Sequence, residues 1–118
     1  MSLSPMIMIV DDNAPMRGII KQYVQSINVN HEFYECSDGL EAVDAFHRLH
    51  PDWVLMDIKM PKMDGLTATK TIRQQFPDAR IIIVSNFDDV DLRAAAQKSG
   101  ATGYVLKERL FELQEIMR

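Results

Sequence analysis

The sequence predicts an α/β fold, a doubly wound parallel sheet of five strands with helices on both faces. Short apolar, strand-like runs alternate with helical patterns along the 118 residues, which is typical of repeated βα units. The run at 53–57 is almost wholly apolar, as a strand covered on both faces should be. Because crossovers in such sheets are right-handed, five strands favour the order 2-1-3-4-5.

The expected elements follow one another without a linker, an internal repeat or a low-complexity tract. Asn13 is a suitable N-cap for the first helix, and Asp38 with Glu41 forms a capping-box-like pair for the second. Pro51 and Pro77 end the second and third helices. The expected strands are 6–11, 31–36, 53–57, 80–85 and 101–106, and the helices occupy about 14–27, 40–49, 66–76, 88–99 and 110–117.

Composition limits the classes of protein. A hydrophobic content of 47% and a charged content of 25% are ordinary for a soluble globular domain. The net charge of -4 and the lack of a Lys/Arg stripe argue against nucleic-acid contact by this segment. No apolar run is long enough to span a membrane, and no signal peptide is visible. The single Cys36 cannot form an internal disulfide, so we expect a cytoplasmic protein. We expect 1–118 to be one domain of a longer protein and interpret 1–3 as a cloning remnant.

Polar residues follow four of the expected strands directly. Asp11 ends the first expected strand and Asp12 follows it, and Asp57, Ser85 and Lys107 end or follow the third, fourth and fifth. The carboxyl ends of parallel strands share one edge of the sheet, where open α/β sheets build their ligand sites. In the order 2-1-3-4-5 the first and third strands are neighbours, so we expect the three aspartates to cluster there.

These residue types together suit phosphoryl transfer. Three close carboxylates repel one another, and Lys107 neutralises only one of them, so we expect a bound Mg²⁺. Asp57 is the expected nucleophile, because it stands alone on the central strand while Asp11 and Asp12 are paired as metal ligands. Lys107 would supply a fixed positive charge, and Ser85 a hydrogen bond to a phosphoryl oxygen.

A purely structural explanation exists for each residue alone. An Asp after an apolar run is often a turn residue or an N-cap, as Asp12, Asp64 and Asp88 could each be. A lysine after a strand is usually a solvated surface group, and Ser85 could merely cap a turn. The occurrence of suitable chemistry at four strand ends together favours a functional site.

Across nearly its whole length the chain resembles the receiver domains of two-component response regulators, most of all those with a LuxR-type helix-turn-helix output. The motifs that carry the resemblance are Asp11-Asp12-Asn13, the segment 57–65 (DIKMPKMDG), Val84-Ser85-Asn86, and the segment 100–108 (GATGYVLKE). The segment from Asp57 to Gly65 is very specific by itself.

The resemblance implies a role for each matching residue. Asp57 would accept phosphate from a sensor histidine kinase, and Asp11, Asp12 and the backbone carbonyl of Lys59 would be further Mg²⁺ ligands. Ser85 would be the switch hydroxyl, Tyr104 the aromatic residue that reorients, and Lys107 the lysine that pairs with the phosphate. The only catalysis would then be self-directed phosphotransfer and dephosphorylation.

The resemblance also implies what the domain controls. Phosphorylation would alter the surface of the fourth helix, fifth strand and fifth helix, and so control an output domain, in this case transcriptional. The chain would be the N-terminal part of a longer regulator that forms a homodimer on phosphorylation. It would contact neither DNA nor a membrane itself.

Two residues depart from the common pattern of the family. Glu108 follows Lys107 where many receivers have proline, so we expect no cis peptide bond there. Asn86 follows Ser85 where many receivers have a very small residue. Because of these departures, an alternative remains that the chain is a receiver-like docking module that phosphorylation does not regulate.

Two further alternatives use similar chemistry or the same fold. A Mg²⁺-dependent aspartyl phosphatase would usually need a second acid two residues after its nucleophile, where this chain has Lys59. The predicted fold is flavodoxin-like, but an FMN-binding electron carrier would need a Ser/Thr/Gly-rich loop where Asp11 and Asp12 stand.

Overall fold

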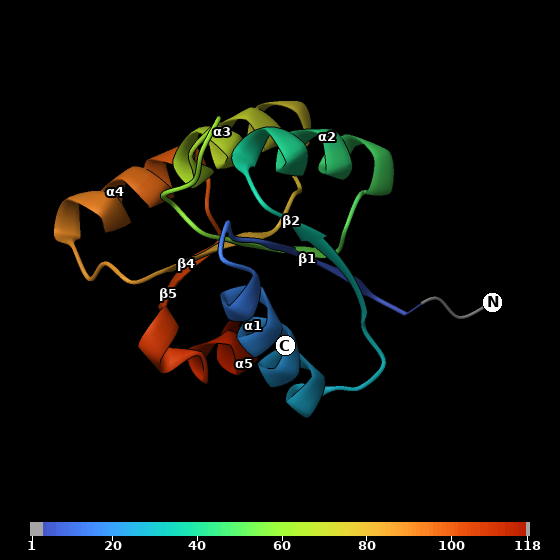
Figure 1. The fold of residues 1–118 in the computed structure, drawn as a ribbon. Helices are drawn as coiled ribbons and strands as arrows, with labels where there is room; N and C mark the ends of the chain where they lie inside the picture. The colour runs from blue at the N-terminus through green and yellow to red at the C-terminus, as the bar shows by residue number, and fades with distance from the viewer. Residues whose placement is uncertain (1–3, 118) are drawn as a thin grey trace.

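The computed structural model describes residues 4–117, which form a five-stranded parallel sheet between two layers of helices (Figure 1). The strand order is β2-β1-β3-β4-β5, and every neighbouring pair is parallel. The predicted fold class and strand order are therefore confirmed. The elements are β1 (Met6–Val10), α1 (Ala14–Ile27), β2 (Glu32–Cys36), α2 (Gly39–Leu49), β3 (Trp53–Met56), α3 (Gly65–Gln75), β4 (Ile81–Ser85), α4 (Val90–Ser99), β5 (Gly103–Leu106), a 3₁₀ turn (Lys107–Arg109) and α5 (Glu112–Ile116).

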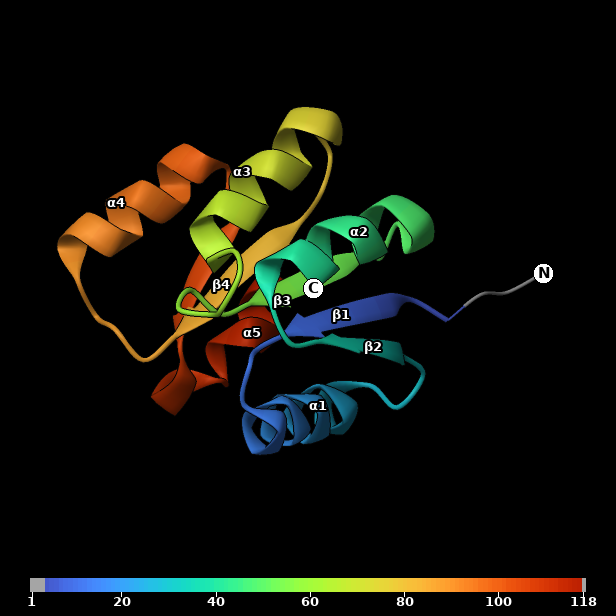
Figure 2. The same ribbon diagram turned by 45° about the horizontal axis from the view of Figure 1, so that its top comes forward.

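The helices cover both faces of the sheet. Figures 1 and 2 show α2, α3 and α4 on one face and α1 with α5 on the other. Successive strand residues point to opposite faces. Met8 and Val10 therefore join the core beneath α2, α3 and α4, whereas Ile7 and Ile9 join the core with α1 and α5. Burial on both sides explains why β1, β3 and β4 are nearly continuous apolar runs.

Side-chain caps fix where three helices begin. The side chains of Asn13, Asp38 and Asp64 accept backbone N–H hydrogen bonds at the starts of α1, α2 and α3, at 2.8, 2.9 and 2.9 Å. The predicted caps Asn13 and Asp38 are thereby confirmed. Asp64 has the capping role that the structural explanation allowed for it.

The fourth and fifth helices differ from the prediction. We expected a helix from Asp88, but α4 begins at Val90, because Asp89 caps it by accepting the Leu92 N–H at 2.9 Å. The final apolar pattern forms a 3₁₀ turn and then the short α5, whose Leu113 is fully buried. The interpretation of 1–3 as a cloning remnant falls outside the described residues. Within 4–117, no helix has the length and apolar character needed to cross a membrane.

Gly65 fixes the start of α3 against the end of β3. A Cβ atom at this position would collide with the backbone carbonyl oxygen of Asp57. The Gly65 N–H donates to the Ile58 carbonyl at 2.7 Å. Only the absence of a side chain allows the helix to begin this close to the residue that follows β3.

Candidate functional site: an acidic pocket at the carboxyl ends of the strands

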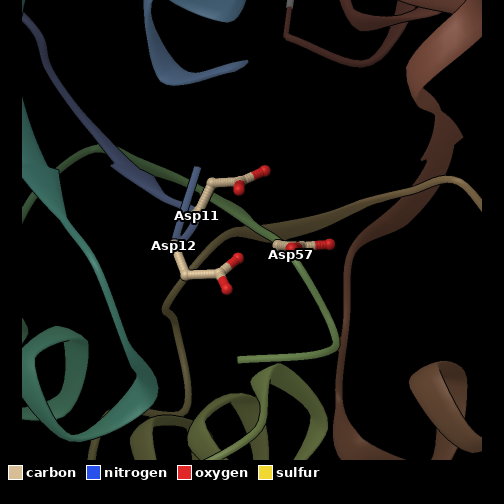
Figure 3. Close-up of side chains that lie close together, drawn as sticks. All are labelled: Asp11, Asp12 and Asp57. Atoms are coloured by element: carbon tan, nitrogen blue, oxygen red, sulfur yellow. The ribbon is translucent and has the colours of Figure 1, made fainter. Parts of the chain in front are cut away.

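The three predicted aspartates lie together at one edge of the sheet. Val10 of β1 is opposite Met56 of β3, so the residues that follow these strands are neighbours. One carboxylate oxygen from each of Asp11, Asp12 and Asp57 lies within 4.8 Å of the other two. Figure 3 shows the three side chains leaving the ends of β1 and β3 toward a common space. The predicted convergence of the acids is therefore present in the structure.

Backbone hydrogen bonds hold two of these acids in place. The Asp11 N–H donates to the Cys36 carbonyl at 3.1 Å, and the Asp57 N–H donates to the Val10 carbonyl at 2.9 Å. Asp11 Oδ1 also accepts the Asn13 N–H at 2.8 Å. The ladder of the sheet thus extends one residue beyond the strands and fixes the position of both carboxylates.

Lys107 reaches the acids from the end of β5. Leu106 is opposite Ser85 in the β4–β5 pair, so Lys107 begins just beyond that edge. Its Nζ lies 2.9 Å from Asp11 Oδ2 and 3.4 Å from Asp57 Oδ1. Only 12% of the Lys107 side chain is exposed, so it is no ordinary solvated surface lysine.

Burial and charge act in opposite directions on these groups. Burial, with the nearby Asp11 charge, raises the pKa of the Asp57 carboxyl above its ordinary value, although the Lys107 ammonium opposes that rise. Burial alone would lower the pKa of Lys107, but its contacts with Asp11 and the charge of Asp57 raise it overall. The site therefore favours an additional positive charge near the carboxylates.

The acids line a pocket of about 370 Å³. Asp11 and Asp57 are buried at its floor, whereas Asp12 is exposed. The residues that line the pocket are Asp11, Asp12, Asn13, Met16, Asp57, Lys59, Asn86, Phe87 and Lys107. Asn13, Lys59, Asn86 and Phe87 are exposed as well, so the pocket opens to solvent above the two buried acids.

The residues present fit a divalent cation with oxygen ligands. Among residues 4–117, Asp11 Oδ2 is the buried side-chain polar atom that receives no well-directed hydrogen bond, even with the Lys107 ammonium nearby. Three carboxylates and one ammonium leave an excess of negative charge. An all-oxygen donor set in an open polar pocket suits Mg²⁺, which retains several water ligands. Asp11, Asp12 and Asp57 would hold such an ion.

Ser85 ends β4 at the predicted edge of the sheet, and its hydroxyl already accepts a hydrogen bond within its own loop. Its side chain is fully buried, and its Oγ accepts the Phe87 N–H at 3.0 Å. From this loop Asn86 and Phe87, rather than Ser85, line the described pocket. The Ser85 hydroxyl still has its own proton to donate, so its predicted hydrogen bond to a phosphoryl oxygen stays a prediction.

Lys59 and Tyr104 both contact Phe87. The Lys59 ammonium lies 4.5 Å from the centroid of the Phe87 ring, and the Tyr104 hydroxyl donates to the Phe87 carbonyl at 2.6 Å. Phe87 therefore connects the loop after β3, the Ser85 hydroxyl and Tyr104 of β5. The roles of the Lys59 carbonyl and of Tyr104 stay predictions.

Arg17 belongs to the surroundings of the site, and our sequence reasoning missed it. Its guanidinium donates to the Asp11 carbonyl at 2.6 Å and to Glu35 Oε1 of β2 at 2.8 Å. Arg17 thus supports the turn that presents the two neighbouring acids. The position of Arg17 in the first turns of α1, close to the acids in sequence, was the signal that could have indicated this role. Its partner Glu35, however, is distant in sequence and could not be inferred.

Comparison with known proteins identifies similar chains. A family model described as "Response regulator receiver domain" matches residues 7–118. The transcriptional regulatory protein DegU of Brevibacillus brevis is 35% identical over 102 residues, which are 86% of this chain and 43% of DegU. The chain thus spans less than half the length of that relative. The chemotaxis protein CheY of Bacillus subtilis is 40% identical over 101 residues, 86% of this chain and 83% of CheY.

A solved structure agrees with these sequence matches. The crystal structure of a LuxR-family two-component response regulator from Aurantimonas sp. SI85-9A1 superposes with a TM-score of 0.87 at 31% identity. The superposition covers 95% of this chain and 81% of that chain. The fold of this chain is therefore one that such a protein shares.

Proposed function

The chain belongs to the response regulator receiver domain family, and we propose that it is a phospho-acceptor switch whose acceptor is Asp57. Phosphorylation-driven switching is the general role of this family. One observation supports the proposal most strongly. At the carboxyl edge of the sheet, the Lys107 ammonium lies 2.9 Å from the Asp11 carboxylate and 3.4 Å from the Asp57 carboxylate.

The proposed reaction transfers one phosphoryl group to a carboxylate oxygen of Asp57. The bond from phosphorus to the donor breaks as the bond to the Asp57 oxygen forms, and the donor leaves with the bonding electron pair. Mg²⁺, when bound, would shield the attacking carboxylate from the anionic phosphoryl group. Lys107 would move its ion pair from Asp57 to a phosphoryl oxygen, and the Ser85 hydroxyl would donate a hydrogen bond to another.

The proposed consequence of phosphorylation runs through Phe87. Ser85 accepts the Phe87 N–H, and Tyr104 donates to the Phe87 carbonyl. A displacement of Ser85 toward a phosphoryl group would therefore move Phe87, whose carbonyl accepts the hydrogen bond from Tyr104. This would change the α4–β5–α5 surface, and we infer that this surface controls an output domain, by likeness to DegU a transcriptional one.

The partners and location follow the same proposal. We propose a sensor histidine kinase as the physiological donor and a homodimer as the phosphorylated form. Contact with DNA would belong to an output domain outside this chain, since the net charge here is -4. We place the protein in the cytoplasm, in keeping with the buried free thiol of Cys36.

Phosphorylation of the isolated domain tests the proposal. The domain is incubated with Mg²⁺ and acetyl phosphate, and its intact mass is measured. We expect one added phosphoryl group on the wild type, none on Asp57→Asn, and a wild-type result for Asp44→Asn, which removes an exposed acid on α2. An unmodified wild type under conditions that label an established receiver domain would contradict the proposal.

A docking module without regulated phosphorylation is the second candidate. The observation in its favour is that Asn86, a larger residue than usual for receivers, lines the pocket beside Asp57. In that case partner binding or dimerisation would be unchanged by beryllofluoride with Mg²⁺, a mimic of the phosphoryl group. The phosphoryl-switch proposal expects both to change.

A further inference from the structure

The outer end of Tyr104 is held at two points. Its hydroxyl donates a hydrogen bond to the Phe87 carbonyl at 2.6 Å. The guanidinium of Arg93, from α4, lies over its ring, with the guanidinium carbon 4.6 Å from the ring centroid. A guanidinium at this distance stacks favourably on an aromatic face. Arg93 therefore links α4 to the aromatic residue of β5 through a contact of its own.

Arg93 has a second partner in the loop before α4. Its Nε lies 3.1 Å from Asp88 Oδ1, and the two side chains are 42% and 69% exposed. An ion pair this exposed contributes little to stability because water and salt screen it. Of the two contacts, only the stack reaches Tyr104, whereas Asp88 contacts the guanidinium from the loop before α4.

Arg93 is the charged residue that lines the hollow beside the ring. Tyr104 and Arg93 line a hollow of about 260 Å³ between α4 and β5. Ala96, Gln97, Ala101, Thr102 and Gly103 also line it, and the Thr102 hydroxyl accepts the Ile81 N–H of β4. Loss of the guanidinium would remove the charged group that lies over the ring face.

We propose that Arg93 is a positioning residue for Tyr104, holding it where its hydroxyl bonds to Phe87. The inference deepens the proposed function, because Tyr104 is the aromatic switch of that proposal. It adds a residue of α4 that biases the position of the switch before any phosphoryl group is present. A stacking contact of this kind shifts the ratio between Tyr104 hydrogen-bonded to Phe87 and Tyr104 without that bond by about two- to fivefold.

The test reads the Tyr104 hydroxyl directly. The domain is labelled with ¹³C at tyrosine Cζ, the carbon that carries the hydroxyl, and the Tyr104 signal is assigned with Tyr104→Phe. We expect Arg93→Met to move this signal toward the position of a water-exposed tyrosine, as the bonded-to-free ratio falls about two- to fivefold. Arg93→Lys should retain more of the bonded form, because an ammonium can also lie over the ring.

Two controls separate stacking from charge. Lys98→Met removes a positive charge from the same helix without a contact to Tyr104, and its Tyr104 signal should match wild type. Asp88→Asn removes the ion pair but leaves the stack, and it should shift the signal much less than Arg93→Met. An unmoved signal in Arg93→Met, an equal shift in Asp88→Asn or Lys98→Met, or no difference between Arg93→Lys and Arg93→Met would overturn the assignment.

The same spectra distinguish this inference from the proposed function. They are recorded first without a phosphoryl mimic and then with beryllofluoride and Mg²⁺. A shift in Arg93→Met without the mimic supports the positioning role even if the mimic leaves Tyr104 unchanged in the wild type. A wild-type Tyr104 signal that the mimic leaves unchanged would count against the phosphoryl switch but not against the positioning role of Arg93.

Discussion

Lys107 lies closer to Asp11 than to Asp57. Its Nζ is 2.9 Å from the Asp11 carboxylate and 3.4 Å from that of Asp57. Asp11 is fully buried, and its Oδ2 has no other close partner among residues 4–117. In the metal-free domain Lys107 therefore compensates a buried charge beside the proposed nucleophile, and phosphorylation would require it to change partners.

Replacing Lys107 should destabilise the domain. Lys107→Met leaves Asp11 buried without a compensating cation, and breaking such a pair costs about 3 kcal/mol in the free energy of unfolding at neutral pH. Urea denaturation in the presence of a chelator measures this. Lys62→Met is the matched control, since Lys62 is 67% exposed and 3.8 Å from Asp38, and it should change stability by less than about 0.5 kcal/mol. Similar losses in both variants would mean that Asp11 does not depend on Lys107.

Magnesium should stabilise the folded domain. An ion held by Asp11, Asp12 and Asp57 binds the native state and not the unfolded chain, so at ten times its dissociation constant it adds about 1.4 kcal/mol to the free energy of unfolding. Thermal unfolding with and without Mg²⁺ checks this. Asp12→Asn should weaken the effect strongly, whereas Asp44→Asn should leave it intact. Equal stabilisation of Asp12→Asn and wild type would place the ion elsewhere.

The stability difference between Asp57→Asn and wild type should depend on pH. Burial is the main cause of the raised pKa of Asp57, above its ordinary value of 3.8. A raised native pKa gives a contribution that is fully present below the unfolded pKa and lost as the pH rises through the native pKa. Without metal, Asp57→Asn should therefore gain stability over wild type as the pH rises from about 4 toward neutrality.

Urea denaturation at several pH values in a chelator measures that difference. Asp44→Asn, which removes an exposed acid, controls for the change in net charge. A difference between Asp57→Asn and wild type that stays constant over this range would show that the native environment does not disfavour the Asp57 carboxylate.

Two glycines should respond in opposite ways to alanine. Gly65→Ala forces a Cβ atom into the Asp57 carbonyl, so it should lower the free energy of unfolding by at least about 2 kcal/mol and slow phosphorylation by acetyl phosphate. Gly18 lies inside α1, and a Cβ atom added to it would meet no heavy atom within 4 Å, so Gly18→Ala should raise stability by about 0.5–1 kcal/mol. A tolerated Gly65→Ala with normal phosphorylation would contradict the close approach of α3 and Asp57.

The sequence allowed the sheet and the meeting of the acids to be predicted because both depend on local patterns. Apolar runs that end in Asp11 and Asp57 become adjacent once strands β1 and β3 are parallel neighbours, whatever the details of the loops. The caps Asn13 and Asp38 are likewise local, since each bonds to an N–H three residues further on.

Contacts between distant segments could not be predicted in the same way. The support of Asp11 by Arg17 depends on Glu35 of β2, and the stack of Arg93 on Tyr104 depends on how α4 packs against β5. The orientation of the Ser85 hydroxyl is a choice among rotamers, settled in the structure by the Phe87 N–H. Side-chain direction within a loop leaves no periodic signal in a sequence.

The polarity of the parallel sheet has a practical consequence for experiments on living cells. Apart from Met16 in the first turn of α1, the residues of the acidic pocket lie where the chain leaves the strands, whereas the turns that enter the strands, such as the one at Pro77 and Asp78 between α3 and β4, lie at the opposite edge. A fluorophore or a short inserted tag at that turn would sit far from the chemistry. Such a fusion should track the protein while leaving its signalling chemistry undisturbed.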